Sequence, residues 1–136
     1  MNTYVELKCF DNKFGTIEDA IQFAEDKELE TAEIFIFSED GTILESQDCG
    51  RTSDDEALIY YTWGIFGYCY SNTGKIEDYD ILSEYIDSEK QAREIAETLK
   101  EKIERYDVVT IEHYSQTLSE NIGDVDEKFE IYRMED

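Results

Sequence analysis

Hydrophobic positions recur along the chain with two different spacings, which predict a mixture of helices and strands. Between residues 89 and 106 the spacing is helical, because apolar residues recur at i, i+3, i+4, i+7, i+11 and i+14. Ser88 precedes this stripe as a candidate N-cap, and Gln91 stands where a capping-box partner is expected. The pattern therefore predicts a long amphipathic helix over 89–106, with an apolar face made by Ala92, Ile95, Ala96, Leu99, Ile103 and Tyr106.

A second, shorter helix is predicted over residues 17–28. Thr16 is a suitable N-cap for it, and Asp19 follows three residues later in a box-like arrangement. One face of this helix is apolar and consists of Ile17, Ala20, Ile21 and Ala24.

Strands are indicated by alternation of apolar and polar residues and by short apolar runs. Asp40 and Gly41 stand between two such runs, which is a strong hairpin signal. The run 34–37 is apolar on both faces, as in a central strand, whereas 47–56 is polar and is predicted to be a loop. The predicted strands are 4–10, 32–37, 42–46, 108–114 and 129–134.

The segment 57–70 is the most aromatic part of the chain. Its Tyr, Ile, Phe and Trp residues favour strands, and we expect one or two strands bent or bulged at Gly64 and Gly67. A helix over 56–62 is the alternative. The following residues, 71–74, have turn composition.

These elements predict an α+β fold. We expect one domain over 1–136, with a mostly antiparallel sheet and the two helices packed on it. The apolar face of the long helix is expected to pack on the sheet that contains Ile34 and Ile36.

Charge is the most unusual property of the chain. It holds 35 acidic and 12 basic residues, a formal net charge of −23, and the segment 89–106 is neutral with five of each sign. The remaining residues therefore carry 30 acids against 7 bases. A hydrophobic content of 40% and an aromatic content of 13% argue against disorder. Solubility requires far less charge, so we expect a basic protein partner, with no direct binding of nucleic acid or membranes.

The sequence contains no recognisable catalytic, cofactor or metal motif. The single histidine, His113, lies in a predicted strand, where a structural role is expected. The segment 78–89 resembles a calcium-binding loop, but Leu82 and Ser83 occupy positions that need an oxygen ligand and a glycine. We therefore expect a protein that is not an enzyme and holds no cofactor.

Three cysteines, Cys9, Cys49 and Cys69, are present without C-x-x-C spacing. The first ten residues lack the apolar stretch of a signal peptide, and no uninterrupted apolar segment is long enough to span a bilayer. A cytoplasmic protein with reduced thiols is expected.

Acidic residues gather in three neighbourhoods, 45–56, 77–89 and 120–136. Carboxylates at i and i+2 of a strand come about 5–7 Å apart, which is roughly the spacing of phosphates along one nucleic-acid strand. We favour the second neighbourhood, because its acids are interleaved with tyrosines that offer contact area. The alternative is that the acids are ordinary solvated positions and the tyrosines partly core. The candidate partner-binding residues are Glu77, Asp78, Tyr79, Asp80, Glu84, Tyr85, Asp87, Asp124, Asp126 and Glu127.

The profile of a small, proline-free, acidic and aromatic α+β protein is similar to that of phage or mobile-element inhibitors. These include anti-CRISPR and anti-restriction proteins, some of which mimic nucleic acid. The resemblance implies an inhibitor that occupies the basic nucleic-acid groove of a nuclease or defence effector. One alternative is an immunity protein or antitoxin that neutralises a cognate toxic nuclease, and another is a small enzyme or metal-binding regulator.

Overall fold

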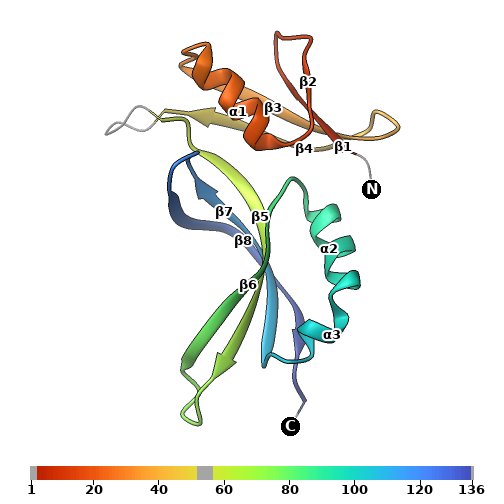
Figure 1. The fold of residues 1–136 in the computed structure, drawn as a ribbon, viewed down its shortest axis with the longest axis vertical. Helices are drawn as coiled ribbons and strands as arrows, with labels where there is room; N and C mark the ends of the chain where they lie inside the picture. The colour runs from red at the N-terminus through yellow and green to blue at the C-terminus, as the bar shows by residue number, and fades with distance from the viewer. Residues whose placement is uncertain (1–2, 52–56, 136) are drawn as a thin grey trace. The chain divides into compact units, whose positions relative to one another are not determined.

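The computed structural model describes residues 3–51 and 57–135, which form an α+β fold (Figure 1). Two antiparallel four-stranded sheets and three helices make up the described chain, which confirms the predicted fold class. The chain divides into two compact units, Met1–Thr62 with Ser115–Asp124 and Trp63–Tyr114 with Val125–Asp136. The expectation of a single domain stays a prediction.

The first sheet has the strand order β2-β1-β3-β4. Its strand β3 is an inner strand, as its apolar run predicted, because Ile36 lies opposite Val5 of β1 and Glu45 of β4. The strands are β1 (Thr3–Leu7), β2 (Lys13–Phe14), β3 (Thr31–Ser38) and β4 (Ile43–Gly50).

Helix α1 (Ile17–Asp26) covers one face of this sheet. Thr16 is the N-cap, as predicted, since its hydroxyl accepts a hydrogen bond of 3.2 Å from the Asp19 amide. The helix ends two residues before the predicted boundary, and Glu28 adopts a left-handed conformation with φ 56°. The first core consists mainly of the helix residues Ile17, Ala20, Ile21 and Ala24 with the strand residues Val5, Leu7, Ile34 and Ile36.

The predicted hairpin between β3 and β4 is confirmed. Gly41 has φ 88°, a left-handed conformation that favours glycine. The Asp40 carboxylate accepts hydrogen bonds from the Ser38 hydroxyl and, at 3.0 Å, from the Thr42 amide.

The second sheet has the order β6-β5-β7-β8, so β6 and β8 are its two edge strands. Its strands are β5 (Tyr60–Tyr70), β6 (Ile76–Ile86), β7 (Val108–Gln116) and β8 (Asn121–Arg133). Strand β5 confirms the strand interpretation of the aromatic segment, and residues 57–59 are not helical. The register of β5 shifts across Gly64, as expected for a bulge, but Gly67 pairs regularly with Asp80.

Strand lengths differ from the predictions mostly where strands lie at a sheet edge, although the inner strand β1 also ends early, at Leu7 instead of residue 10. Strand β4 continues to Gly50, so the loop predicted over 47–56 is wrong for residues 47–50. Strand β8 begins at Asn121 instead of residue 129, and β2 and β6 were not predicted at all. Edge strands expose polar residues on both faces, so they lack the clean alternation by which half-buried strands are recognised.

The long helix is interrupted at Leu99. Helix α2 (Glu89–Thr98) is followed by the single turn α3 (Lys100–Ile103), and the Thr98 hydroxyl donates a 2.6 Å hydrogen bond to the Ile95 carbonyl at the break. Such a bond competes with the backbone ladder of the helix. The predicted N-cap is confirmed, because the Ser88 hydroxyl accepts from the Gln91 amide at 3.2 Å.

The expected packing of this helix on Ile34 and Ile36 is wrong. Its apolar residues belong to a second core, with the strands of the second sheet, while Ile34 and Ile36 belong to the first core. A helical stripe shows that a face is buried but not which sheet receives it. The second core contains Trp63, Ile65, Ile86, Ala92, Ala96, Ile103, Val109 and Ile111.

Candidate acidic binding surface

The favoured acidic neighbourhood forms most of edge strand β6. Among the described strands, β6 pairs only with β5, and its other edge is not paired within the sheet. The side chains of this strand are well placed to meet a partner because they are exposed. The exposed candidate residues on it are Glu77, Asp78, Tyr79, Asp80, Glu84 and Tyr85.

The register of β6 separates acids from aromatic residues. Asp78 and Asp80 alternate with Tyr79 and Ile81, and successive residues of a strand point to opposite faces. Tyr79 lies opposite Tyr68 of β5, with the two ring centroids 6.1 Å apart. Residues that are interleaved in sequence are therefore on opposite faces of the sheet, which corrects the expectation that charge and aromatic contact area coincide.

Asp80 is held in place by a neighbouring tyrosine. The Tyr106 hydroxyl donates a hydrogen bond of 2.7 Å to Asp80 Oδ2, and this bond is the main reason that the pKa of Tyr106 is raised. Tyr106 belongs to the second core, so Asp80 and Asp78 point to the face that carries the helices. A carboxylate fixed in this way loses less conformational entropy when a partner binds.

Asp87 does not belong to this surface. It is only 5% exposed and directly precedes the N-cap Ser88, whereas Glu77, Asp78, Asp80 and Glu84 are exposed. Tyr85, by contrast, is 51% exposed and has φ 58°. It lies in a bulge, in which two residues of β6 stand opposite Gly64 of β5. The bulge therefore turns Tyr85 outward, while Asp87 contributes to the start of α2.

The other candidate acids, Asp124, Asp126 and Glu127, are exposed on β8. Because β5 and β7 lie between the edge strands, β6 and β8 are separated by about 14 Å across the sheet. Asp126 Oδ2 lies 3.3 Å from Nδ1 of His113, whose ring stacks on Trp63 at 4.5 Å. The two sets of acids thus form separate surfaces.

In the remaining acidic neighbourhood, Asp48 is exposed on β4 and Glu45 is half-buried. Asp54, Asp55 and Glu56 lie outside the described residues. Among the described acids of this neighbourhood, only Asp48 is exposed.

A buried carboxylate that sequence reasoning missed lies on the face of the second sheet opposite to the helices. Glu112 is 6% exposed and accepts hydrogen bonds from the hydroxyls of Tyr68, at 2.5 Å, and Thr110, at 2.7 Å. Lys128 Nζ lies 3.9 Å from the same carboxylate and 5.0 Å from the centroid of the Tyr68 ring. Burial and the bond to Glu112 raise the pKa of Tyr68. The alternation of β7 was a signal for a strand but gave no indication of these partners.

The described residues offer little for catalysis. They contain no group of three His, Cys, Asp or Glu side chains that could hold a metal ion. Burial raises the pKa of the Cys69 thiol and raises that of Cys49 to about 12, so neither favours the nucleophilic thiolate. His113 is occupied by its contacts with Trp63 and Asp126.

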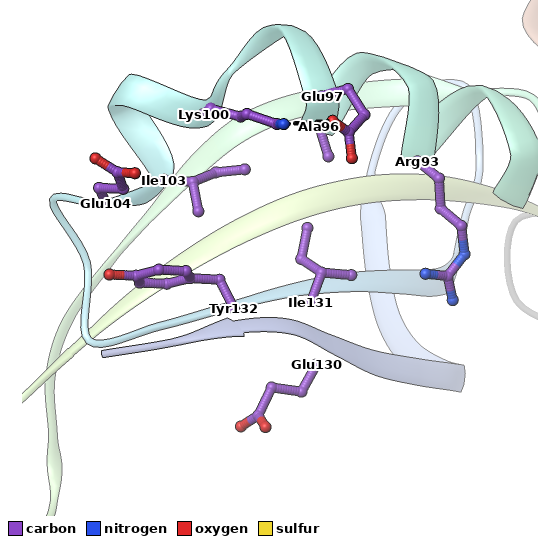
Figure 2. Close-up of a pocket in the computed structure, with 9 residues that line it drawn as sticks. All are labelled: Arg93, Ala96, Glu97, Lys100, Ile103, Glu104, Glu130, Ile131 and Tyr132. Carbon is purple, nitrogen blue, oxygen red and sulfur yellow. Dashed lines mark ion pairs between the residues drawn. The ribbon is translucent and has the colours of Figure 1, made fainter. Parts of the chain in front are cut away.

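A groove of about 530 Å³ lies between the two short helices and β8 (Figure 2). Both of its cations have partners, since Lys100 pairs with Glu97 at 2.9 Å and Arg93 pairs with Glu89 at 2.8 Å. No His, Cys or Ser is among its described lining residues. It is lined by Arg93, Ala96, Glu97, Lys100, Ile103, Glu104, Glu130, Ile131 and Tyr132.

No protein-family model matches this chain, and the comparisons with curated proteins and with solved structures found no match either. None of the helices in residues 3–51 and 57–135 is long and apolar enough to cross a membrane.

Proposed function

We propose that this chain is a non-enzymatic acidic inhibitor that binds the basic nucleic-acid-binding surface of a nuclease or defence effector. It acts in the cytoplasm and replaces nucleic acid on its target, in the manner of phage or mobile-element anti-CRISPR and anti-restriction proteins.

The observation that carries this proposal is the row of exposed carboxylates on edge strand β6. Asp78 and Asp80 point to the same face and, as i and i+2 residues of a strand, lie about 7 Å apart. Glu77 and Glu84 are further exposed acids of the same strand. Arg and Lys side chains that are arranged for successive phosphates can meet such a row, and binding then releases counterions as nucleic acid does.

Electrostatic attraction also supports the proposal. The unit that contains β6 has 17 acids against 8 bases, a net charge of −9, and the other unit has 18 acids against 4 bases, a net charge of −14. Both units therefore attract a basic partner over a distance, while β6 supplies a local row of acceptors. Long-range attraction raises the association rate, and the local contacts determine the site.

The test compares two variants with the same change of net charge. In the first, Asp78→Asn, Asp80→Asn and Glu84→Gln neutralise β6. In the second, Glu94→Gln, Glu101→Gln and Glu104→Gln neutralise exposed acids in and after the two short helices. Each protein is immobilised and used to capture proteins from a lysate of host cells, and captured proteins are eluted with duplex DNA or with 0.5 M NaCl.

We expect the parent and the helix variant to capture nucleic-acid-binding proteins that duplex DNA displaces, and the β6 variant to lose at least nine-tenths of them. A third variant, with Asp124→Asn, Asp126→Asn and Glu127→Gln, tests β8 in the same way. Capture that survives in all three variants and withstands duplex DNA excludes nucleic-acid mimicry.

A further inference from the structure

The outer edge of β6 is suited to accept a further strand (Figure 1). Soluble proteins commonly protect edge strands with lysine, proline or bulges. Strand β6 contains neither lysine nor proline, and its residues 78–81 pair with β5 in an unbroken register. Every residue from 76 to 81 is exposed, on both faces of the sheet. An extended segment of another protein can therefore reach the backbone of this strand.

The hydrogen bonds of β5 show which backbone groups of β6 face outward. The Tyr68 carbonyl accepts from the Asp107 amide at 3.0 Å, and the Tyr70 amide donates to Asp107 Oδ2 at 2.7 Å, so both residues direct their backbone groups toward β7. Tyr79, which lies opposite Tyr68, is therefore in a non-hydrogen-bonded pair and directs its N–H and C=O away from β5. Ile81 does the same two residues further on.

One of these outward groups is held by a side chain of the same strand. The Tyr79 amide donates a hydrogen bond of 2.8 Å to Asp78 Oδ1, at an exposed position. This bond agrees with the outward direction of the amide. A strand that pairs with β6 replaces it by a backbone bond, and the released Asp78 carboxylate can then accept from a basic side chain of that strand.

Charge determines which kind of strand fits this edge. Strand β6 has four acids and no base, whereas β4 has two acids and no base, and β8 has four acids and two bases. Like charges opposite each other in neighbouring strands are destabilising and opposite charges are favourable. A second copy of β6 is therefore repelled from this edge, and a basic strand is attracted.

We propose that an extended basic segment of the target pairs with β6 as an additional strand of the second sheet. The inference rests on the proposed function for the identity of the target and adds the way in which the target binds. Basic arms of this kind are common in nucleic-acid-binding proteins.

The alternation of β6 specifies the side chains of the bound segment. Basic residues of the segment lie on the face of Asp78 and Asp80, and apolar residues lie beside Tyr79 and Ile81, which are 56% and 46% exposed. A segment of alternating basic and apolar residues therefore satisfies both faces. The backbone bonds supply affinity, and the side chains of the two faces supply specificity.

Two synthetic peptides test this inference with the full-length parent protein. The first is a blocked peptide of eight residues in which arginine and valine alternate, and the second carries proline in place of each valine. Both have the same charge, but proline lacks the N–H that a residue opposite Tyr79 donates to β6. We expect calorimetric titration in 0.1 M NaCl to show at least tenfold tighter binding of the valine peptide.

Amide hydrogen exchange measured by NMR locates the bound peptide. At saturation with the valine peptide, we expect exchange at Tyr79 and Ile81 to slow at least tenfold, because their outward amides become hydrogen-bonded. Asp126, an exposed residue of the other edge strand β8, is the control and should change less than twofold.

A matched pair of variants separates the backbone of Tyr79 from its ring. Tyr79→Pro removes the outward N–H without removing a bond between β5 and β6, and an edge strand tolerates proline at such a position. We expect it to weaken binding of the valine peptide at least tenfold. Tyr79→Thr keeps the N–H and the strand propensity, and it should weaken binding less than threefold. Urea unfolding checks that both variants are folded.

Equal affinities of the two peptides overturn strand addition, because charge alone then accounts for binding. Unchanged exchange at Tyr79 and Ile81 in the saturated complex overturns it as well, whether or not the proline variant folds. Displacement of captured target proteins by duplex DNA is a separate measurement, so nucleic-acid mimicry and strand addition can fail independently.

Discussion

At the scale of single residues, the bond between Tyr68 and Glu112 links stability to pH. The pKa of Tyr68 is raised above its ordinary value near 10, first by burial and then by the Glu112 carboxylate. The folded protein therefore keeps this proton at a pH where the unfolded chain has released it, so the stabilisation is complete below pH 10 and declines as the pH rises further. We expect the free energy of unfolding in urea to fall between pH 9 and pH 11, and to fall less steeply in Tyr68→Phe.

The same substitution has an effect at neutral pH. Removal of the hydroxyl leaves the buried Glu112 with one hydrogen-bond donor fewer, which should cost about 1–3 kcal/mol at pH 7. Tyr79→Phe, on an exposed ring of the same sheet, is the control and should be nearly neutral. An equal pH dependence in parent and Tyr68→Phe contradicts the link.

At the scale of elements, Gly67 is where β5 packs closely against the segment that follows α3. A Cβ at this position would lie 2.6 Å from Cγ of the Tyr106 ring, which is far closer than packed atoms allow. Because Cγ is near the backbone, the ring cannot simply rotate away. We expect Gly67→Ala to cost about 1–3 kcal/mol in urea unfolding, as overpacking does.

Gly50→Ala is the matched control for this substitution, because nothing lies within 4 Å of a Cβ built there. It should be neutral or slightly stabilising, since alanine restricts the unfolded chain more than glycine does. Equal costs at both glycines would show that the Tyr106 ring does not restrict β5.

The helices and most inner strands were predictable from the sequence, whereas the edge strands were predicted only in part or not at all. The stripe of α2, its cap Ser88 and the central strand β3 follow from local periodicity and capping chemistry. Strand β6 was recognised only as an acidic neighbourhood. Its candidate residues were therefore found, but the sheet faces on which their side chains lie were not. Had 76–86 been predicted as a strand, the alternation of side chains between its two faces would have placed Asp78 and Asp80 on the face opposite to Tyr79. The pairing of Tyr68 with Glu112 joins residues 44 positions apart and depends on β5 lying beside β7, which no local pattern indicates.

At the scale of the whole molecule, negative charge is spread over both compact units, with −14 on one and −9 on the other. Asp78 and Asp80 of β6 lie on the face opposite to Tyr68 and Tyr79. Added salt is expected to weaken the proposed charge-driven interaction with a basic target. Residues 89–106 carry no net charge, and their ion pairs, such as Glu89 with Arg93 at 2.8 Å, are local to the helix.

The number of cooperative units is also a property of the whole molecule. Strands β5, β7 and β8 each contribute residues to both compact units, so opening one unit disrupts hydrogen-bonded strands that the other shares. We therefore expect one unfolding transition in urea.

Two probes can follow the two cores separately. Trp63, the only tryptophan, reports on the second core by its fluorescence. The buried thiol of Cys49 reports on the first core by its reactivity, in a variant in which Cys9→Ser and Cys69→Ser remove the other thiols. The two probes should give the same midpoint and the same slope, because a two-state transition exposes both cores together. Midpoints that differ by more than about 0.5 M urea would show two domains that unfold separately.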